Sequence, residues 1–393
     1  MNRREFLGSA AAAFTTGNVL AWLPQPCWAA VNYQKLLILV ELKGGNDGLN
    51  TVIPYADSQY AALRPRIAVA RDQVLQLDES TGLNPALSAL MPLWKAGEVA
   101  VVQGVGYPSA NLSHFRSIEI WDTASKSTEY LQEGWLTRAF VQAPVPRTFA
   151  ADAVVIGSAE LGPFSGGGAR ATRTIALTNT EQFLQQAKLA APAGQAGNAA
   201  LNHILRVEQD IVQAAAGLVN ASGKPAFRTV FPQTAFGNAV RTAAQVVASG
   251  SGVAALKLSV NGFDTHSGQV GTHTGLLKQL AEGLAALKSA LSEIGRWDDT
   301  LVVTYAEFGR RPRENASAGT DHGTASAHFV LGGRVKGGLY GQRPALDRLD
   351  GNGNMPFSVD FRDIYATVLE RWWGLDTSVA LRGRFAPLAI LRA

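Results

Sequence analysis

Cysteine is almost absent from this sequence. Cys27 is the only cysteine in 393 residues. A single cysteine cannot form an internal disulfide, and it is too few for an iron–sulfur cluster or a cysteine-based zinc site. Cys27 also lies in a segment that we expect to be removed on export. The mature chain would then have no thiolate nucleophile, and a redox function based on cysteine is excluded.

The chain also lacks a large excess of either charge, and long apolar runs are scarce. Lysine and arginine number 35 against 31 aspartates and glutamates, which gives a net charge of +4. No basic stripe with interleaved aromatic residues is present, so we do not expect nucleic-acid binding. Beyond the N-terminal segment no apolar run is long enough to cross a bilayer. We therefore expect no stable membrane span after cleavage.

The first residues follow the pattern of an export signal. Arg3 and Arg4 precede an apolar, alanine-rich stretch that ends near Leu23. Paired arginines before such a stretch are typical of twin-arginine signals. A small-x-small cleavage pattern at 27–29 predicts a signal peptide over residues 1–29. The expected partner in export is the twin-arginine translocase, and the expected location is the periplasm or the exterior. An uncleaved membrane anchor is the alternative.

Four continuous apolar runs predict strands that are buried on both faces. They cover residues 35–42, 98–105, 255–260 and 300–305. Helical patterns alternate with them at 85–96, 203–219, 235–248, 276–294 and 361–373. This alternation predicts an α/β fold with a mostly parallel sheet flanked by helices. We expect one domain over residues 30–393, with a helical insertion at about 123–250 where alanine, glutamine and glycine dominate.

Polar side chains follow each of the four predicted strands. Because parallel strands end at the same edge of a sheet, these side chains should lie close together. Converging carboxylates and imidazoles favour a divalent metal such as Zn, Mn or Ca. The candidates are Asp47 in the first loop, Ser113 and His114 in the second, Asp264 and His266 in the third, and Glu307, Arg310, Arg311, Asp321 and His322 in the fourth.

Several of these residues have a structural alternative. Asp47 lies between glycines and can be a turn residue, and Ser113 can cap the following helix. His114 is either a ligand or a packed ring. Glu307 can form an ion pair with Arg310. The Asp-His pair at 321–322, in a loop flanked by glycines, is the strongest candidate.

Five segments resemble a family of twin-arginine-exported bacterial proteins of uncharacterised function, related to the alkaline phosphatase and sulfatase superfamily. The segments are GGNDGLNTVIPY, NLSHFRS, GFDTHSGQ, AEFGRRPREN and GTDHGTASAHFVLGG. With the signal and the run at 360–366, the resemblance spans nearly the whole chain. It implies an alkaline phosphatase-like fold, with Asp47 as a first metal carboxylate and Ser113 as the nucleophile. It also implies a second metal at Asp264 and His266 that His322 completes.

The sequence departs from the superfamily pattern in three places. Glu307-Phe308 stands where an Asp-His pair is expected, and Asp321-His322 is either that pair displaced by a loop or a separate feature. Asp264 and His266 are closer in sequence than is usual. No Ser/Cys-x-Pro-x-Arg segment is present to supply the formylglycine of a typical sulfatase.

Two functions follow as hypotheses. The first is a periplasmic, metal-dependent hydrolase of phosphate or sulfate esters, acting on an anionic small molecule or polymer. In this hypothesis Arg310 or Arg311 holds the anion through its planar guanidinium. The second is a non-catalytic export or envelope-assembly protein that keeps the fold with a degenerate site. Metal content would separate the two.

Overall fold

A computed structural model describes residues 31–166, 172–177 and 227–392. The predicted signal peptide, the predicted helix at 203–219 and much of the expected insertion lie outside the described residues. The chain divides into a unit of residues 1–31 and a compact unit of residues 32–393.

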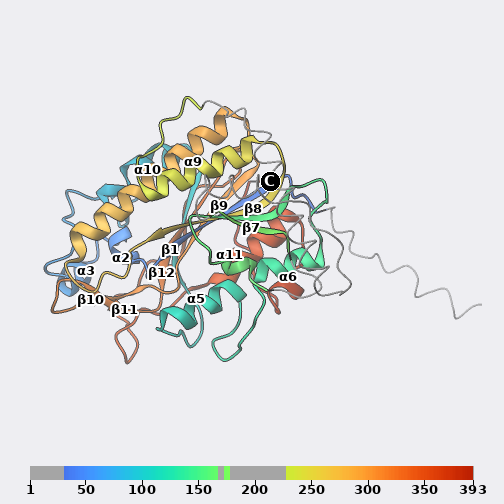
Figure 1. The fold of residues 1–393 in the computed structure, drawn as a ribbon. Helices are drawn as coiled ribbons and strands as arrows, with labels where there is room; N and C mark the ends of the chain where they lie inside the picture. The colour runs from blue at the N-terminus through green and yellow to red at the C-terminus, as the bar shows by residue number, and fades with distance from the viewer. Residues whose placement is uncertain (1–30, 167–171, 178–226, 393) are drawn as a thin grey trace, which may run out of the picture. The chain divides into compact units, whose positions relative to one another are not determined.

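A largely parallel sheet forms the centre of this unit, as predicted (Figure 1). All four predicted strands are present, and their observed bounds differ from the predicted ones by at most two residues. The strands in spatial order are β13 (Gly338–Gly341), β5 (Val99–Gly106), β12 (Ser326–Leu331), β9 (Thr300–Tyr305), β1 (Leu36–Lys43), β8 (Val253–Asn261), β6 (Ala151–Ile156) and β7 (Thr174–Leu177), while β14 (Val359–Asp360) also pairs with β5.

Strand β12 is antiparallel to both of its neighbours, β5 and β9, and the other pairs in this sheet are parallel. Strands β5, β9, β1 and β8 therefore run in the same direction. Their C-terminal ends meet at one edge of the sheet, and the loops that carry the candidate site residues leave from that edge.

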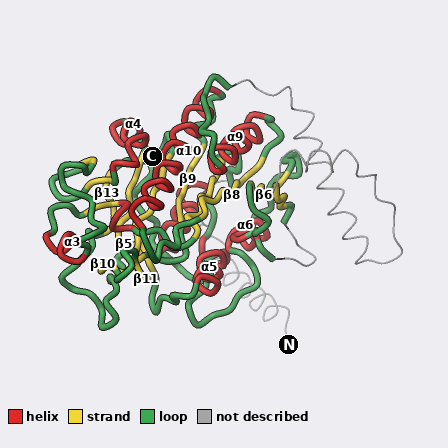
Figure 2. The backbone as a smooth tube through the Cα atoms, turned by 60° about the vertical axis from the view of Figure 1, so that its left-hand side comes forward, coloured by secondary structure: helices red, strands yellow, loops and turns green. Residues whose placement is uncertain are grey.

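Helices cover both faces of the sheet (Figures 1 and 2). One face carries α9 (Ala235–Ala248), α10 (Gln269–Glu293), η2 (Pro85–Leu90) and α4 (Met91–Lys95), and the other carries α5 (His114–Thr123), α6 (Trp135–Gln142), α11 (Phe361–Ala366) and the π-helical η4 (Thr367–Trp373). The shorter elements are α2 (Gly48–Thr51), α3 (Ser58–Leu63), η3 (Gly162–Phe164), α12 (Thr377–Ala380), the small sheet of β2 (Val52–Ile53), β4 (Gly82–Leu83) and β3 (Leu75–Gln76), and the hairpin of β10 (Arg310–Glu314) and β11 (Thr320–His322).

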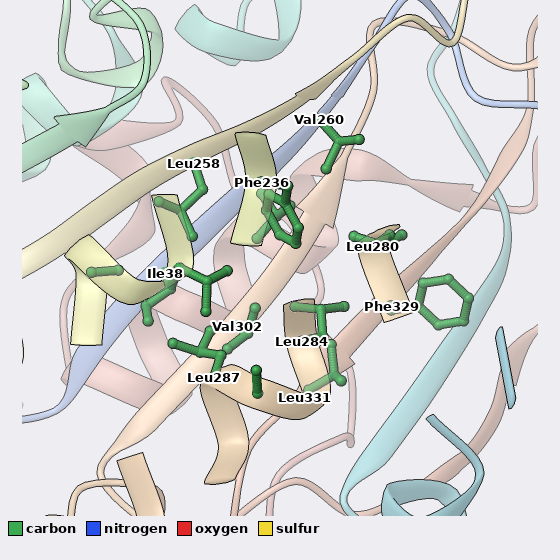
Figure 3. Packing of buried hydrophobic residues seen from close by; sticks show 14 of the residues in the cluster. Ile38, Phe236, Leu258, Val260, Leu280, Leu284, Leu287, Val302, Phe329 and Leu331 are labelled. Carbon is green, nitrogen blue, oxygen red and sulfur yellow. The ribbon is translucent and has the colours of Figure 1, made fainter. Parts of the chain in front are cut away.

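The core follows the alternation of side chains along buried strands. Ile38 and Val40 of β1 point toward α9 and α10, where they join a cluster that includes Phe236 and Leu284 (Figure 3). On the opposite face aromatic rings fill the core: Trp121 stacks on Phe361, and Trp135 stacks on Tyr365, each pair with ring centroids 4.3 Å apart.

The expected helical insertion contributes strands to the sheet. Strand β6 is buried along its whole length, and it pairs with β8 on one side and β7 on the other. The physical reason is its apolar sequence, because a short fully buried run satisfies its backbone groups best inside a sheet. In the described part of the chain, no helix is long and apolar enough to cross a membrane.

Candidate metal centre

Three loops at the C-terminal edge of the sheet bring three imidazoles and one carboxylate together. Asp264 and His266 follow β8, His114 begins α5, and His322 ends β11. We call these four residues the histidine–aspartate cluster. All four were candidates from the sequence, and the structure brings them to one place.

The ligand atoms of this cluster are close to one another. Nε2 of His322 lies 2.9 Å from Nε2 of His266 and 3.4 Å from Oδ1 of Asp264. The same Asp264 oxygen lies 3.0 Å from Nε2 of His266 and 3.4 Å from Nε2 of His114. One atom each from His114, Asp264 and His322 falls within 4.8 Å of the others, so these three residues could hold a metal ion.

The outer ring nitrogens of the histidines face acceptors. Nδ1 of His114 lies 2.8 Å from Oε1 of Glu307, and Nδ1 of His322 lies 2.8 Å from the carbonyl oxygen of Leu112. Nδ1 of His266 lies farther from its acceptor, 3.7 Å from Oδ1 of Asp321. Metal-binding histidines usually donate the other ring N–H to a carboxylate or a backbone carbonyl, which fixes the tautomer and the ring orientation.

This arrangement leaves lone pairs facing one another. If His114 and His322 donate from Nδ1, their Nε2 atoms are acceptors when the rings are neutral. Nε2 of His114 is buried and has no hydrogen-bond partner among the described residues. Two bare nitrogens beside a carboxylate oxygen repel one another unless a cation lies between them. The donor set therefore fits a divalent metal, and nitrogen and oxygen donors of this kind suit zinc.

Arg310 holds Asp264 in place. Its Nη2 lies 2.7 Å from Oδ1 of Asp264, while Nε and Nη1 donate to the carbonyls of Gly45 and Thr320 at 2.8 and 2.9 Å. Burial tends to raise the pKa of Asp264, but the hydrogen bond and charge of Arg310 hold that pKa below its ordinary value. Arg310 is fully buried. Its guanidinium therefore positions a ligand and is not free to hold a substrate anion.

Two glycines let the loops approach closely enough to form the cluster. Gly44 has a φ of +115°, and a Cβ there would lie 2.4 Å from the backbone nitrogen of Asp264. A Cβ on Gly319 would lie 2.2 Å from the carbonyl carbon of His266. Both distances are shorter than real Cβ contacts, so any larger residue would push the loops apart.

Glu307 and Asp321 face the Nδ1 atoms of two cluster histidines, His114 and His266. Oε1 of the buried Glu307 accepts from the Gly44 N–H at 2.9 Å and contacts His114, as described above. The half-exposed Asp321 accepts a hydrogen bond from Asn315 at 3.1 Å. Both carboxylates support histidines in this geometry, whereas the sequence analysis placed them among the ligands.

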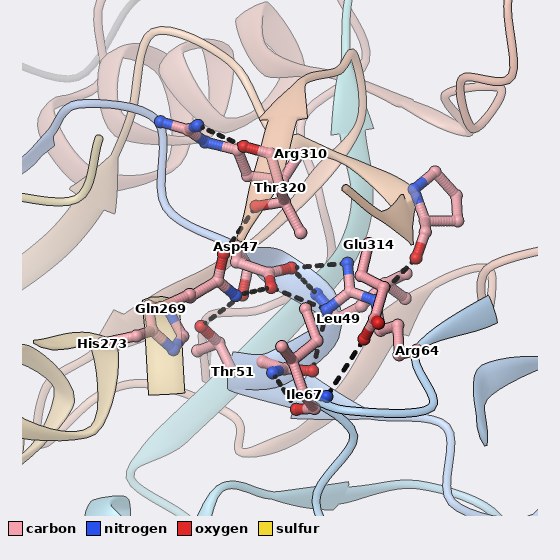
Figure 4. Close-up of polar contacts among 12 residues, drawn as sticks. Asp47, Leu49, Thr51, Arg64, Ile67, Gln269, His273, Arg310, Glu314 and Thr320 are labelled. Carbon is pink, nitrogen blue, oxygen red and sulfur yellow. Dashed lines mark hydrogen bonds and ion pairs between the residues drawn. The ribbon is translucent and has the colours of Figure 1, made fainter. Parts of the chain in front are cut away.

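Asp47 is bound by Arg64 and Gln269, outside the histidine–aspartate cluster (Figure 4). It is fully buried, and Arg64 binds both of its oxygens at 2.6 and 3.0 Å. Gln269 donates to it as well, and its Oδ1 accepts from the Leu49 N–H at the start of α2. Burial acts to raise the pKa of Asp47, but Arg64 outweighs it and the pKa is lowered. The structure does not bring Asp47 into the cluster, so its carboxylate is not available for the first metal that the resemblance implied.

The remaining candidates have distinct surroundings. Ser113 is exposed at the N-terminus of α5, and its side chain makes no capping hydrogen bond. Arg311 is half-buried, and its carbonyl accepts from Arg64 at 3.0 Å. His273 is buried, with Nε2 2.9 Å from Oδ1 of Asn46, and burial lowers its pKa to about 4.

Sequence reasoning missed Arg64, Gln269 and the Leu112 carbonyl. Gln269 lies within the GFDTHSGQ segment, which gave a signal for it. Arg64 directly follows the short helix α3 and belongs to no motif, and nothing in its spacing indicates that it pairs with Asp47. Backbone carbonyls carry no sequence signal at all.

A family model described as "Protein of unknown function (DUF1501)" matches residues 96–382. This match covers more than half of the sequence, so the chain belongs to that family. No curated protein matches the chain.

Solved structures show a distant likeness to members of the alkaline phosphatase superfamily. A protein of that superfamily from Vibrio parahaemolyticus is 12% identical, with 99% of this chain and 80% of that chain covered and a TM-score of 0.43. The lipoteichoic acid synthase LtaP from Listeria monocytogenes is 12% identical, with 89% and 77% covered and a TM-score of 0.37. The C-terminal periplasmic domain of EcEptC from Escherichia coli, solved with Zn, is 11% identical, with 76% and 72% covered and a TM-score of 0.32. The site assignments above rest on the contacts within this chain.

Proposed function

We propose that the histidine–aspartate cluster binds a divalent metal, zinc before manganese or calcium, and that the protein is an exported hydrolase of phosphate or sulfate esters. The observation that carries the proposal is the convergence of His114, Asp264 and His322 with their supporting acceptors. His266 provides a fourth, more exposed nitrogen. Zinc prefers nitrogen ligands at about 2.0–2.1 Å, whereas calcium prefers six to eight oxygens.

The reaction assigned to the site follows from what surrounds the ligands. A metal bound there would polarise an ester oxygen and lower the pKa of a nearby water or hydroxyl. Ser113 directly precedes His114, and its exposed hydroxyl is the nucleophile in this proposal. The N-terminus of α5 favours negative charge, because the first backbone N–H groups of a helix have no partner within the helix. Glu307 keeps the His114 ring oriented throughout.

The experiment for this proposal measures metal content first and activity second. Protein purified without chelators should contain about one zinc per chain. The zinc-loaded protein should hydrolyse p-nitrophenyl phosphate or p-nitrophenyl sulfate, and Ser113→Ala should abolish turnover while metal content stays the same. Loss of activity with His322→Ala should instead accompany loss of metal.

A second candidate is a non-catalytic protein of export or envelope assembly that keeps the fold with a degenerate site. Two sets of contacts favour it. Arg64 forms an ion pair with Asp47, and Arg310 binds backbone carbonyls and Asp264. Asp47, expected as a carboxylate of the first metal, and Arg310, one of the two arginines expected to hold a substrate anion, thus have structural roles. Full zinc binding without hydrolysis of phosphate, sulfate or phosphonate esters would favour this candidate. Absence of metal binding, unchanged by added zinc, manganese or calcium, would defeat the hydrolase proposal and also favour this candidate.

A further inference from the structure

A cavity of about 220 Å³ lies apart from the histidine–aspartate cluster. Its walls come from the start of α2, from β5, from the beginning of β12 and from the loop at 342–358. None of the four cluster residues lines it. The volume corresponds to roughly seven water molecules at about 30 Å³ each, which is also room for part of a small organic molecule.

One part of the lining is apolar and another is cationic. Leu49, Val52 and Met355 line the cavity together with Phe357, whose side chain is 38% exposed. Two arginines, Arg343 and Arg348, also line it. An apolar wall beside cations is suited to a molecule with an apolar body and an anionic group.

The two arginines are available for a ligand. Arg343 forms no hydrogen bond or ion pair with any other residue in the described ranges, and the acid it influences, Asp78, is already bound by the N–H groups of Ser80 and Thr81. Arg348 lies 3.8 Å from Asp347, and both side chains are at least 75% exposed. Exposed pairs of this kind contribute little energy and separate easily.

Gln103, on β5, also lines the cavity and is only 5% exposed. Its Oε1 is buried and has no hydrogen-bond partner among the described residues. Protein atoms cover that oxygen, so Gln103 forms part of the wall without offering its acceptor to a ligand.

We propose that this cavity binds a small organic anion with an apolar body. Arg343 and Arg348 bind the anionic group, and Leu49, Met355 and Phe357 contact the apolar part. The proposal does not depend on the metal centre, because the two sites share no residue.

The test uses 8-anilinonaphthalene-1-sulfonate, which combines an apolar ring system with a sulfonate. Its fluorescence is titrated with the purified protein in the presence of EDTA and again with zinc. We expect saturable one-to-one binding that is the same in both conditions. Octyl sulfate should displace the probe, and octyl glucoside, which lacks the charge, should displace it much less.

Two variants decide the assignment. Arg343→Ala combined with Arg348→Ala should weaken probe binding about tenfold or more, because charge-assisted hydrogen bonds are lost. Arg371→Ala is the matched control, because Arg371 is also exposed and lies 3.7 Å from a neighbouring acid, Glu370, but does not line the cavity.

Unchanged affinity in the double arginine variant would overturn the proposal, as would several weak sites that no variant affects. Circular dichroism and melting temperatures of all variants show whether each is folded, and the arginine variants are expected to fold because both side chains are exposed. Loss of ester hydrolysis or of zinc binding would leave this result untouched, so the two proposals fail independently.

Discussion

Nδ1 of His114 lies 2.8 Å from Oε1 of Glu307, and the same carboxylate oxygen accepts the Gly44 N–H at 2.9 Å. One buried oxygen thus joins the start of α5 to the loop that follows β1. It also fixes which nitrogen of His114 faces Asp264. The ligand geometry therefore depends on a residue that does not reach the metal position itself.

Glu307→Gln should weaken zinc binding by about tenfold or more, because supporting carboxylates of ligand histidines typically contribute about 10–100-fold in affinity. The amide oxygen can still accept a hydrogen bond, but the negative charge that makes His114 a better ligand is lost. Competition with a chromophoric chelator measures the change. Glu160→Gln is the control, because that exposed glutamate pairs with Lys43 outside the cluster. Equal affinities of wild type and Glu307→Gln would contradict this role.

His322 and His273 should respond in opposite ways to replacement by alanine. His322→Ala should lower zinc affinity by at least about tenfold and change the melting temperature little, because this residue lies partly exposed at the end of a hairpin. His273→Ala should keep zinc affinity and lower the melting temperature by several degrees, since it leaves a cavity and removes one of the two contacts of Asn46 Oδ1, the other being the Thr51 hydroxyl at 3.1 Å, at a cost of roughly 1–3 kcal/mol. A His322→Ala variant that keeps its metal and melts early would remove His322 from the ligand set.

The sequence predicted the strands and the convergence of loops well, for a physical reason. Fully buried parallel strands need continuous apolar runs, and such runs end at polar loops on a single edge. This reasoning found all members of the histidine–aspartate cluster. It could not predict which residue contacts which. Glu307 reaches His114, and His322 reaches the Leu112 carbonyl, only through tertiary packing.

The fate of Asp47 shows where sequence reasoning stops. Its position after the first strand is the one that a metal carboxylate would occupy, and the resemblance placed it there. Arg64 reaches it from the C-terminal end of α3, and no periodicity or motif marks that arginine. Strands β6 and β7 were missed for a different reason. Short apolar runs in an alanine-rich region cannot be told from helix by their pattern.

Arg64→Ala should destabilise the fold by about 3–5 kcal/mol, because it leaves the Asp47 carboxylate buried and unpaired. It also removes the hydrogen bonds from Arg64 to the Pro312 and Arg311 carbonyls, at 2.7 and 3.0 Å. Zinc affinity per folded molecule should stay unchanged. Urea unfolding and zinc titration measure the two effects. If Asp47→Asn removes zinc at little cost in stability, Asp47 is a ligand after all.

The Asp47–Arg64 pair also predicts an acid limit to stability. The pKa of Asp47 is lowered in the folded protein, so the folded state binds a proton here less readily than the unfolded state. The contribution of the pair is therefore complete above the ordinary aspartate pKa of about 3.9 and is lost as the pH falls through the lower folded value. Urea unfolding between pH 5 and pH 2.5, about one unit either side of that pKa, would show no such loss in Asp47→Asn if the assignment is correct.

His328 should make stability depend on pH in a higher range. Its ring is fully buried on β12 against Trp121, neither nitrogen has a partner among the described residues, and burial lowers its pKa to about 3. The pKa of an unfolded histidine is about 6.5, so below that pH the unfolded state binds a proton that the folded state does not bind. Stability should therefore fall by about 1.4 kcal/mol per pH unit for this residue between pH 6.5 and the folded value.

His328→Phe keeps an aromatic contact with Trp121 and should remove that slope, even if the change in packing alters the free energy of unfolding at every pH. Urea unfolding of both proteins in EDTA at pH 7, 6, 5 and 4 measures the slopes without a contribution from bound metal, and His273 should leave a residual slope in the variant. Identical slopes would mean that His328 is protonated, or paired, in the folded protein.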